Sequence, residues 1–326
     1  MDDTGGVRRR TLAGLAAAAP FAARVSVQAA APPKIGFVYV GPRDLAAQRL
    51  DVIMSGIRST YPGDVIPVMR VTEGDPSRLV PAVAEVLAEN VSVFVAVGPA
   101  VLRAVRAATE TVPIVAYSFE SDPVADGFVQ SVARPGGTIT GVFLDVPSFV
   151  AKWLEFLREC LPRLSRVALL WDTGSGRIQA DALTRTAREL GLAADLLEVQ
   201  GRADYDGAFT AARERGAEAT VLLSSPLVFA NIPDLAALAL RQRQPTITLF
   251  AEFARAGGLL AYGPSALGAS RQAGFMAGRI LRGQSPSTLP VEQPSIYNLA
   301  INLRTAAQLG ITIPPSLLAR ADEVIE

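Results

Sequence analysis

Short runs of β-branched and aromatic residues alternate with longer amphipathic segments from Lys34 onward. This alternation is typical of parallel strands joined by helices, which pack as an open α/β lobe. In the first half we predict strands at 35–40, 65–69, 91–97 and 114–117, with helices near 44–60, 76–90 and 99–109.

The same pattern then begins again. We predict strands at 166–171, 194–199, 219–223 and 246–250, and helices near 177–191, 204–215 and 231–242. The two halves share the order and spacing of their elements, and 326 residues are enough for two buried cores. The sequence therefore predicts two Rossmann-like, doubly wound parallel-sheet lobes of the α/β class, joined by a hinge of crossover strands.

Two segments rich in turn formers, 134–142 and 256–264, are expected to act as crossovers or hinges between the lobes. A helix is predicted near 267–282, and the tail after it is too short for a third domain. We expect an N-terminal lobe of 34–142 plus about 265–290, and a C-terminal lobe of 143–264 plus about 291–326.

Residues 1–29 have the pattern of a signal peptide. Arg8 to Arg10 precede a short apolar run at 11–19, and small residues follow at 27–31. The run is too short to span a bilayer, and the paired arginines resemble a twin-arginine export signal, with a general secretory signal as the alternative. We expect cleavage near Ala29 to Ala31 and a periplasmic protein without a lipid anchor, because no cysteine follows the run.

Composition argues against most catalytic classes. The chain has no histidine and one cysteine, Cys160, so the commonest general base and metal ligand are missing, together with any disulfide or Cys-x-x-Cys pair. Acidic and basic residues balance at 31 each, which suggests no nucleic-acid partner. No phosphate-binding or dinucleotide-binding glycine loop follows a predicted strand. We predict no catalytic residues, no cofactor and no metal, and a buried structural role for Cys160.

Polar and aromatic residues gather where the predicted strands end. Parallel sheets bind ligands at the carboxyl ends of their strands, so these residues are the candidate ligand contacts. Glycines there let a ligand approach the backbone, hydroxyl groups can bind a carboxylate, acidic groups can bind an ammonium, and aromatic rings can enclose a ring. The candidates are Tyr39, Gly41, Gly98, Pro99, Tyr117, Ser118, Phe119, Asp122, Trp171, Asp172, Thr173, Ser224, Ser225, Phe250 and Glu252. Each also has a structural explanation, as a turn former or a core residue.

Four segments, Ser131 to Gly137, Glu252 to Pro264, Leu289 to Pro294 and Ile313 to Glu326, resemble the ABC transporter substrate-binding family whose best-known members bind tryptophan or tyrosine. The resemblance runs from about Lys34 to Glu326. It implies a type I periplasmic-binding fold, a small solute, and partners in the membrane, a permease and an ATPase.

The ligand that the resemblance favours is an aromatic or other hydrophobic amino acid. Where the family commonly has a glycine followed by a hydroxyl residue, this chain has Gly98 and Pro99, so one expected carboxylate contact is missing.

The function predicted is that of an extracytoplasmic solute-binding component of an ABC importer, which closes about its hinge and acts as a monomer. One alternative is a periplasmic sensory receptor, in which the closed lobes dock on a kinase or chemoreceptor. Another is an enzyme on the same scaffold, since a fold does not determine a function.

Overall fold

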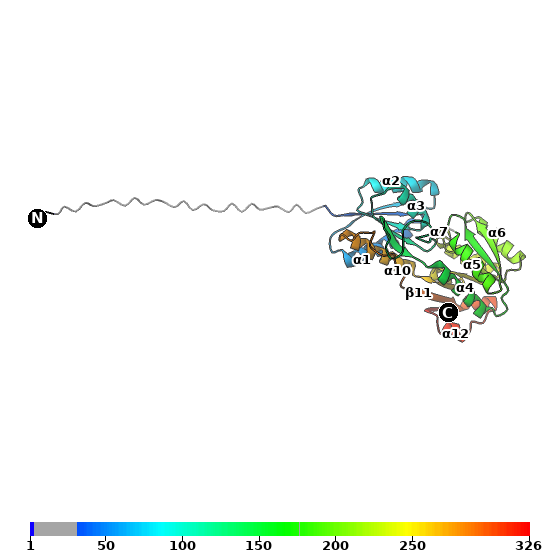
Figure 1. Cartoon of the computed structure of the whole chain (residues 1–326). Helices are drawn as coiled ribbons and strands as arrows, with labels where there is room; N and C mark the ends of the chain where they lie inside the picture. The colour runs from blue at the N-terminus through cyan, green and yellow to red at the C-terminus, as the bar shows by residue number, and fades with distance from the viewer. Residues whose placement is uncertain (3–30, 176) are drawn as a thin grey trace. The chain divides into compact units, whose positions relative to one another are not determined.

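A computed structural model describes residues 1–2, 31–175 and 177–326 of this chain (Figure 1). Residues 32–326 form one compact unit. The predicted signal peptide lies outside the described residues, except for its first two. None of the helices in the described part is both long and apolar enough to cross a membrane.

The first sheet is entirely parallel, with the strand order β2-β1-β3-β4-β5. Its strands are β1 (Lys34–Tyr39), β2 (Ile66–Val71), β3 (Val93–Val97), β4 (Ile114–Ser118) and β5 (Ile139–Phe143). Helices α1 (Arg43–Thr60), α2 (Leu79–Ala88) and α3 (Pro99–Ala108) connect them, and a 3-10 turn, Pro76–Arg78, precedes α2. Strands β4 and β5 are buried along their whole length, as expected for a parallel sheet covered on both faces.

The second sheet has seven strands in the order β12-β11-β10-β9-β8-β6-β7. They are β6 (Arg166–Asp172), β7 (Ala193–Val199), β8 (Ala219–Leu222), β9 (Thr246–Thr248), β10 (Leu260–Pro264), β11 (Tyr297–Asn302) and β12 (Glu323–Ile325). The pairing of β10 with β11 is antiparallel, and the other pairs are parallel. The helices after β5 are α4 (Val146–Cys160), α5 (Ile178–Glu189), α6 (Asp204–Glu214), α7 (Pro226–Ala230), α8 (Ile232–Arg241), α9 (Ala251–Arg255), α10 (Ala266–Leu281), α11 (Leu303–Leu309) and α12 (Pro315–Leu318).

The two segments predicted as crossovers contain strands of the sheets. Residues 134–142 include most of β5, and residues 256–264 include β10. Gly141, which reads as a turn former in the sequence, has φ +151°, and a Cβ there would lie 1.9 Å from the carbonyl oxygen of Ala116 in β4. The glycine is therefore needed for close strand pairing, and the chain leaves the first sheet only after β5.

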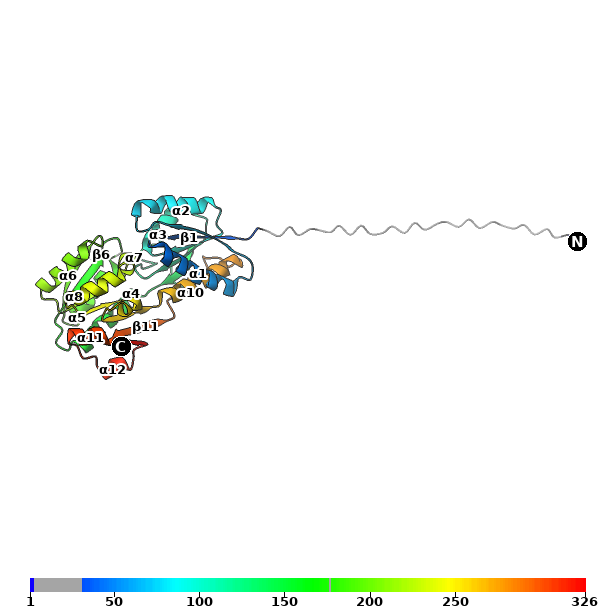
Figure 2. The ribbon, with the colours of Figure 1, turned by 180° about the vertical axis from the view of Figure 1, so that it is seen from behind.

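Helix α10 follows β10 of the second sheet but packs against α1 of the first, and the two helices lie side by side in Figures 1 and 2. Glycines allow this close approach. A Cβ at Gly56 would lie 2.1 Å from the carbonyl oxygen of Arg271, and one at Gly274 would lie 2.1 Å from that of Ile53. Thr60 adds a hydrogen bond, since its hydroxyl donates to the carbonyl oxygen of Phe275 at 3.1 Å.

The second sheet is anchored to α4 by a buried tryptophan. The ring of Trp153 is fully buried, and its Nε1–H donates to the carbonyl oxygen of Tyr262 in β10 at 2.7 Å. At the end of the same helix, Cys160 is buried, which confirms the predicted structural thiol, and burial raises its pKa to about 12. The thiol therefore stays protonated at neutral pH.

Candidate functional site

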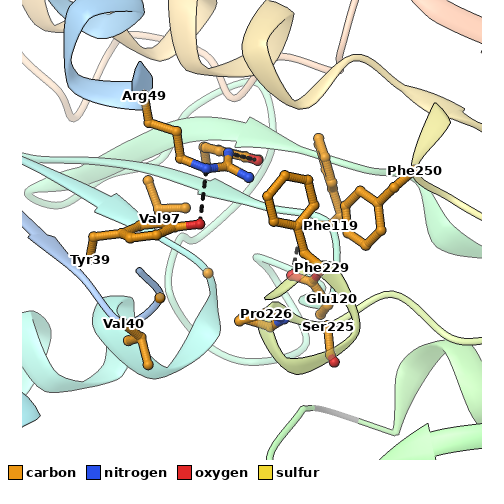
Figure 3. A pocket seen from close by; sticks show the side chains of 13 residues that line it. Tyr39, Val40, Arg49, Val97, Phe119, Glu120, Ser225, Pro226, Phe229 and Phe250 are labelled. Atoms are coloured by element: carbon orange, nitrogen blue, oxygen red, sulfur yellow. Dashed lines mark hydrogen bonds between the residues drawn. The ribbon is translucent and has the colours of Figure 1, made fainter. Parts of the chain in front are cut away.

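A cavity lies between the carboxyl ends of the first sheet and the loops and short helices that follow β8 and β9 of the second sheet (Figure 3). Its empty space is about 500 Å³, a volume that includes the part open to solvent. The lining residues are Tyr39, Val40, Gly41, Arg49, Val97, Gly98, Tyr117, Phe119, Glu120, Ser225, Pro226, Phe229 and Phe250.

Each sheet contributes a pair of aromatic side chains to the cavity. At the end of β4, the rings of Tyr117 and Phe119 meet edge to face with centroids 4.9 Å apart. From the second sheet, the rings of Phe229 in α7 and Phe250 before α9 meet in the same way at 4.8 Å. The cavity is therefore walled by aromatic rings from two separate parts of the chain, an environment suited to an apolar or aromatic ligand group.

Arg49 brings a positive charge to this apolar wall. It extends from α1, is only 4 % exposed, and donates from Nε to the hydroxyl of Tyr39 at 3.2 Å and from Nη1 to that of Tyr117 at 2.7 Å. Its guanidinium carbon also lies 4.7 Å from the ring centroid of Phe229. Burial by itself lowers the pKa of Arg49, but the oxygens of Tyr117 and Tyr39 raise it, and the net shift is upward. Arg49 is therefore cationic throughout the working pH range.

Glu120 is the acidic residue of the cavity. Its carboxylate accepts hydrogen bonds from the Ser224 hydroxyl at 2.6 Å and from the backbone N–H of Phe119 at 3.2 Å. Burial raises its pKa to about 7, although both hydrogen bonds and the charge of Arg49 work in the opposite direction. The Glu120 carboxyl group thus loses its proton near neutral pH, and it lies buried between the two lobes.

A second hydrogen-bonded residue joins the same two chain segments. Gln179, near the start of α5, donates from Nε2 to the carbonyl oxygen of Phe119 at 3.2 Å, and its Oε1 accepts from the backbone N–H of Ser224 at 2.8 Å. Because Phe119 follows β4 and Ser224 follows β8, the Gln179 side chain bridges the two sheets. We refer to Phe119, Glu120, Gln179 and Ser224 as the interlobe latch.

Seven of the predicted site residues line the cavity. They are Tyr39, Gly41, Gly98, Tyr117, Phe119, Ser225 and Phe250. They follow β1, β3, β4, β8 and β9, or lie at the ends of these strands, so their common position at the carboxyl edge of the sheets explains why they come together.

The other predicted residues lie outside the cavity lining. They are Pro99, Ser118, Asp122, Trp171, Asp172, Thr173, Ser224 and Glu252. Ser118 alternates with its two aromatic neighbours along β4, so its side chain points away from them and its hydroxyl donates to that of Ser121. Ser224 reaches the site only through the latch.

The remaining predicted residues have local structural roles. Asp122 accepts hydrogen bonds from the N–H groups of Val124 and Ala125, and Asp172 accepts one from Gly174, so both carboxylates stabilise turns. The indole N–H of Trp171 donates to the carbonyl oxygen of Ser175 within the same loop. The backbone N–H of Thr173 donates to the carbonyl oxygen of Val199, and Pro99 is the first residue of α3.

Glu252 lies in the first turn of α9 with 39 % of its side chain exposed, and it pairs with Arg255 at 3.9 Å. The Glu252 carboxylate therefore lies at the protein surface beside Arg255 and does not line the cavity.

The sequence predictions missed six residues that line the cavity: Val40, Arg49, Val97, Glu120, Pro226 and Phe229. A signal for Arg49 exists in the sequence, because it lies within the apolar stripe of α1 formed by Ala46, Leu50 and Ile53. Arginine is rarely buried unless its charge has a partner, so an arginine on the apolar face of a helix is a candidate for a functional residue. Glu120 has a weaker signal, as a single charge that directly follows the buried strand β4.

Solved structures share this architecture. A conserved domain protein from Vibrio cholerae superposes with a TM-score of 0.81 at 23% identity, covering 90% of this chain and 99% of that one. An ABC domain from Streptococcus pneumonia in complex with L-Trp has a TM-score of 0.79 at 22% identity, covering 90% and 100%. Two lobes built on mainly parallel sheets, with a cavity between their carboxyl ends, form a type I periplasmic-binding fold, which confirms the predicted fold class.

The sequence model of a family described as ABC transporter substrate binding protein matches residues 63–325. The chain belongs to this family, which confirms the resemblance noted in its sequence. The family consists of substrate-binding proteins rather than enzymes. A curated relative, the tyrosine-binding protein of Clostridioides difficile, is 22% identical over 208 residues, which are 63% of this chain and 59% of the relative.

Among the described residues, no three Asp, Glu or Cys side chains come together in a way that could hold a metal ion.

Proposed function

We propose that this protein captures an aromatic or other hydrophobic amino acid in the cavity and delivers it to an ABC importer. The observation that carries the proposal is that two aromatic pairs, Tyr117 with Phe119 from the first sheet and Phe229 with Phe250 from the second, line the same cavity. An apolar side chain placed between them would be removed from water, and burial of a side chain of this size contributes roughly 1.5 to 3 kcal/mol.

The comparisons support this ligand class. One relative is named as a tyrosine-binding protein, and one structural neighbour is in complex with L-Trp. The proposal extends to the partners and the location: a permease and an ATPase in the membrane, action as a monomer, and export to the periplasm by the predicted signal at residues 1–29.

The proposed mechanism is closure about a hinge. The ligand docks while the interlobe latch is open, and closure then buries it and joins Glu120 to Ser224. The moving bodies we propose are residues 34–142 with about 265–290, and residues 143–264 with about 291–326. The packing of α10 against α1 supports this division, because it ties the helix after β10 to the first sheet. The importer would recognise the closed form.

Calorimetric titration with L-tryptophan, L-tyrosine, L-phenylalanine and L-leucine tests the ligand class. We expect binding of at least one of them, weakened about tenfold or more by Phe229→Ala or Phe250→Ala, because each variant removes one aromatic wall. Phe275→Ala is the matched control, since Phe275 is 41 % exposed on α10 and does not line the cavity. Absence of binding for all four amino acids would contradict the proposal.

Uptake by cells tests the importer. Deletion of the gene should abolish accumulation of the labelled amino acid, and the wild-type chain should restore it while the Phe229→Ala, Phe250→Ala double variant should not. Unchanged uptake in the deletion strain would exclude the importer role even if the purified protein binds the amino acid.

A further inference from the structure

Arg49 is a buried cation that forms no ion pair with any of the described residues. Within residues 31–175 and 177–326 its guanidinium makes two side-chain hydrogen bonds, to the hydroxyls of Tyr39 and Tyr117, and no ion pair. A guanidinium has five N–H donors, so three remain without a protein acceptor. Taking a guanidinium out of water is unfavourable unless an anion compensates its charge.

Glu120 lines the same cavity and the charge of Arg49 lowers its pKa, but the two side chains do not form an ion pair. Its carboxylate is 6 % exposed and accepts its hydrogen bonds from Ser224 and from the backbone of Phe119, and no ion pair within 4.0 Å joins it to Arg49. In Figure 3 the two charged side chains enter the space from different sides, Arg49 from above and Glu120 from below. The cavity thus presents separate positive and negative groups, with aromatic rings beside them.

We propose that Arg49 binds the carboxylate of the ligand and Glu120 its ammonium group, so that the cavity selects zwitterionic α-amino acids. This inference rests on the proposed function and names the two groups that would determine its specificity. A carboxylate matches the planar fork of a guanidinium, which can donate two parallel N–H bonds to it. An ammonium group can share the lone pairs that remain on the Glu120 oxygens.

The start of α3 offers the cavity one backbone donor fewer than a helix start that lacks proline. The first residue of that helix is Pro99, which lies beside Gly98 of the cavity lining and has no backbone N–H. A ligand carboxylate at this helix end therefore lacks one of the donors that a helix N-terminus usually offers. The guanidinium of Arg49 supplies charged donors to the same cavity.

Ligand analogues paired with variants test both charges. The probes are L-tryptophan, L-tryptophanamide, which lacks the carboxylate, and indole-3-propionate, which lacks the ammonium group. For the wild-type protein we expect each analogue to bind about 100-fold more weakly than L-tryptophan, because each leaves one buried charge without its partner.

In Arg49→Met the loss of the carboxylate should no longer matter, so that L-tryptophan and its amide bind within about threefold of each other. In Glu120→Gln the same convergence is expected between L-tryptophan and indole-3-propionate.

Arg58→Met is the matched control on α1, since Arg58 is exposed, and it should leave all three affinities unchanged. Circular dichroism and the melting temperature of each ligand-free variant check the fold. If Arg49→Met does not fold, Arg49→Lys replaces it, since lysine keeps the positive charge but not the planar fork of the guanidinium. The affinity of Arg49→Lys for L-tryptophan should fall at least about tenfold, and its affinity for the amide should not change.

Each outcome bears on one proposal. A folded Arg49→Met variant that still prefers L-tryptophan to the amide as strongly as the wild type overturns the part assigned to Arg49, and leaves the proposed function intact. An unchanged preference over indole-3-propionate in Glu120→Gln does the same for Glu120. If the wild type binds no amino acid, the proposed function fails. In that case, binding of indole-3-propionate that depends on Arg49 would still support a carboxylate site at Arg49. If the wild type binds neither L-tryptophan nor indole-3-propionate, both the proposed function and the role of Arg49 are overturned.

Discussion

Replacing Glu120 by glutamine should stabilise the ligand-free protein above neutral pH and leave it unchanged in acid. The carboxylate is 6 % exposed and is surrounded by the aromatic cavity, and burial raises its pKa from the ordinary 4.5 to about 7. Glutamine has the same shape, can accept from the Phe119 N–H, and can donate to the Ser224 hydroxyl. The substitution therefore removes the charge while keeping the latch.

The sign and size of the effect follow from proton linkage. Between pH 4.5 and about 7 the folded protein retains a proton on Glu120 that the unfolded chain has already released. The free energy of unfolding therefore falls as the pH rises through this window, and the full penalty is present above pH 7. The difference between a pKa of 4.5 and one of about 7 corresponds to about 3 kcal/mol.

Urea unfolding followed by circular dichroism, at several pH values from about 4 to 8, measures this difference. Glu120→Gln should match the wild type below about pH 4.5 and exceed it by about 3 kcal/mol at pH 8. Glu110→Gln controls for the loss of one negative charge at an exposed position. Parallel pH profiles for the wild type and Glu120→Gln would refute the argument, because they would mean that burial does not disfavour the charge.

Two further predictions concern packing and closure. Gly274→Ala should lower the free energy of unfolding by about 2 kcal/mol or more, because its methyl carbon would lie 2.1 Å from the carbonyl oxygen of Ile53. Gly207→Ala in α6 is the control: its methyl carbon would have nothing within 4 Å, so urea unfolding should show no change or a gain of up to about 1 kcal/mol. Ser224→Ala removes the hydrogen bond from the Ser224 hydroxyl to the Glu120 carboxylate, which joins side chains of the two sheets. Small-angle X-ray scattering of the ligand-free variant should therefore show a larger radius of gyration than that of the wild type. An unchanged radius would mean that this bond does not hold the lobes together.

The regular elements were largely predictable because their patterns depend on neighbouring residues. The apolar run predicted at 91–97 contains β3, and the amphipathic segment predicted at 44–60 is α1. The predicted boundaries differ from the observed ones by a few residues. The predicted strand 246–250 ends at Thr248, since α9 begins at Ala251, and α7 was missed although Ser225 and Pro226 have the preferred residue types for a helix start.

The binding surface was predictable only in part. Residues at strand ends could be named because parallel strands end at a common edge, and this rule found the aromatic pair of Tyr117 and Phe119. The rule could not separate Tyr117 from Ser118, since the choice between the two faces of a strand depends on which face the other lobe covers. It also cannot find a residue such as Arg49, which reaches the cavity from a helix.

By itself the sequence determined the class of fold and the edges of the sheets at which a ligand could bind, because periodicity and turn chemistry act over a few residues. Only the tertiary structure decided which charges meet there. Arg49 donates to Tyr117 at a separation of 68 residues, and Ser224 donates to Glu120 at a separation of 104. Such contacts depend on how two separately predicted sheets are brought together, and the burial that raises the pKa of Glu120 exists only after they have met.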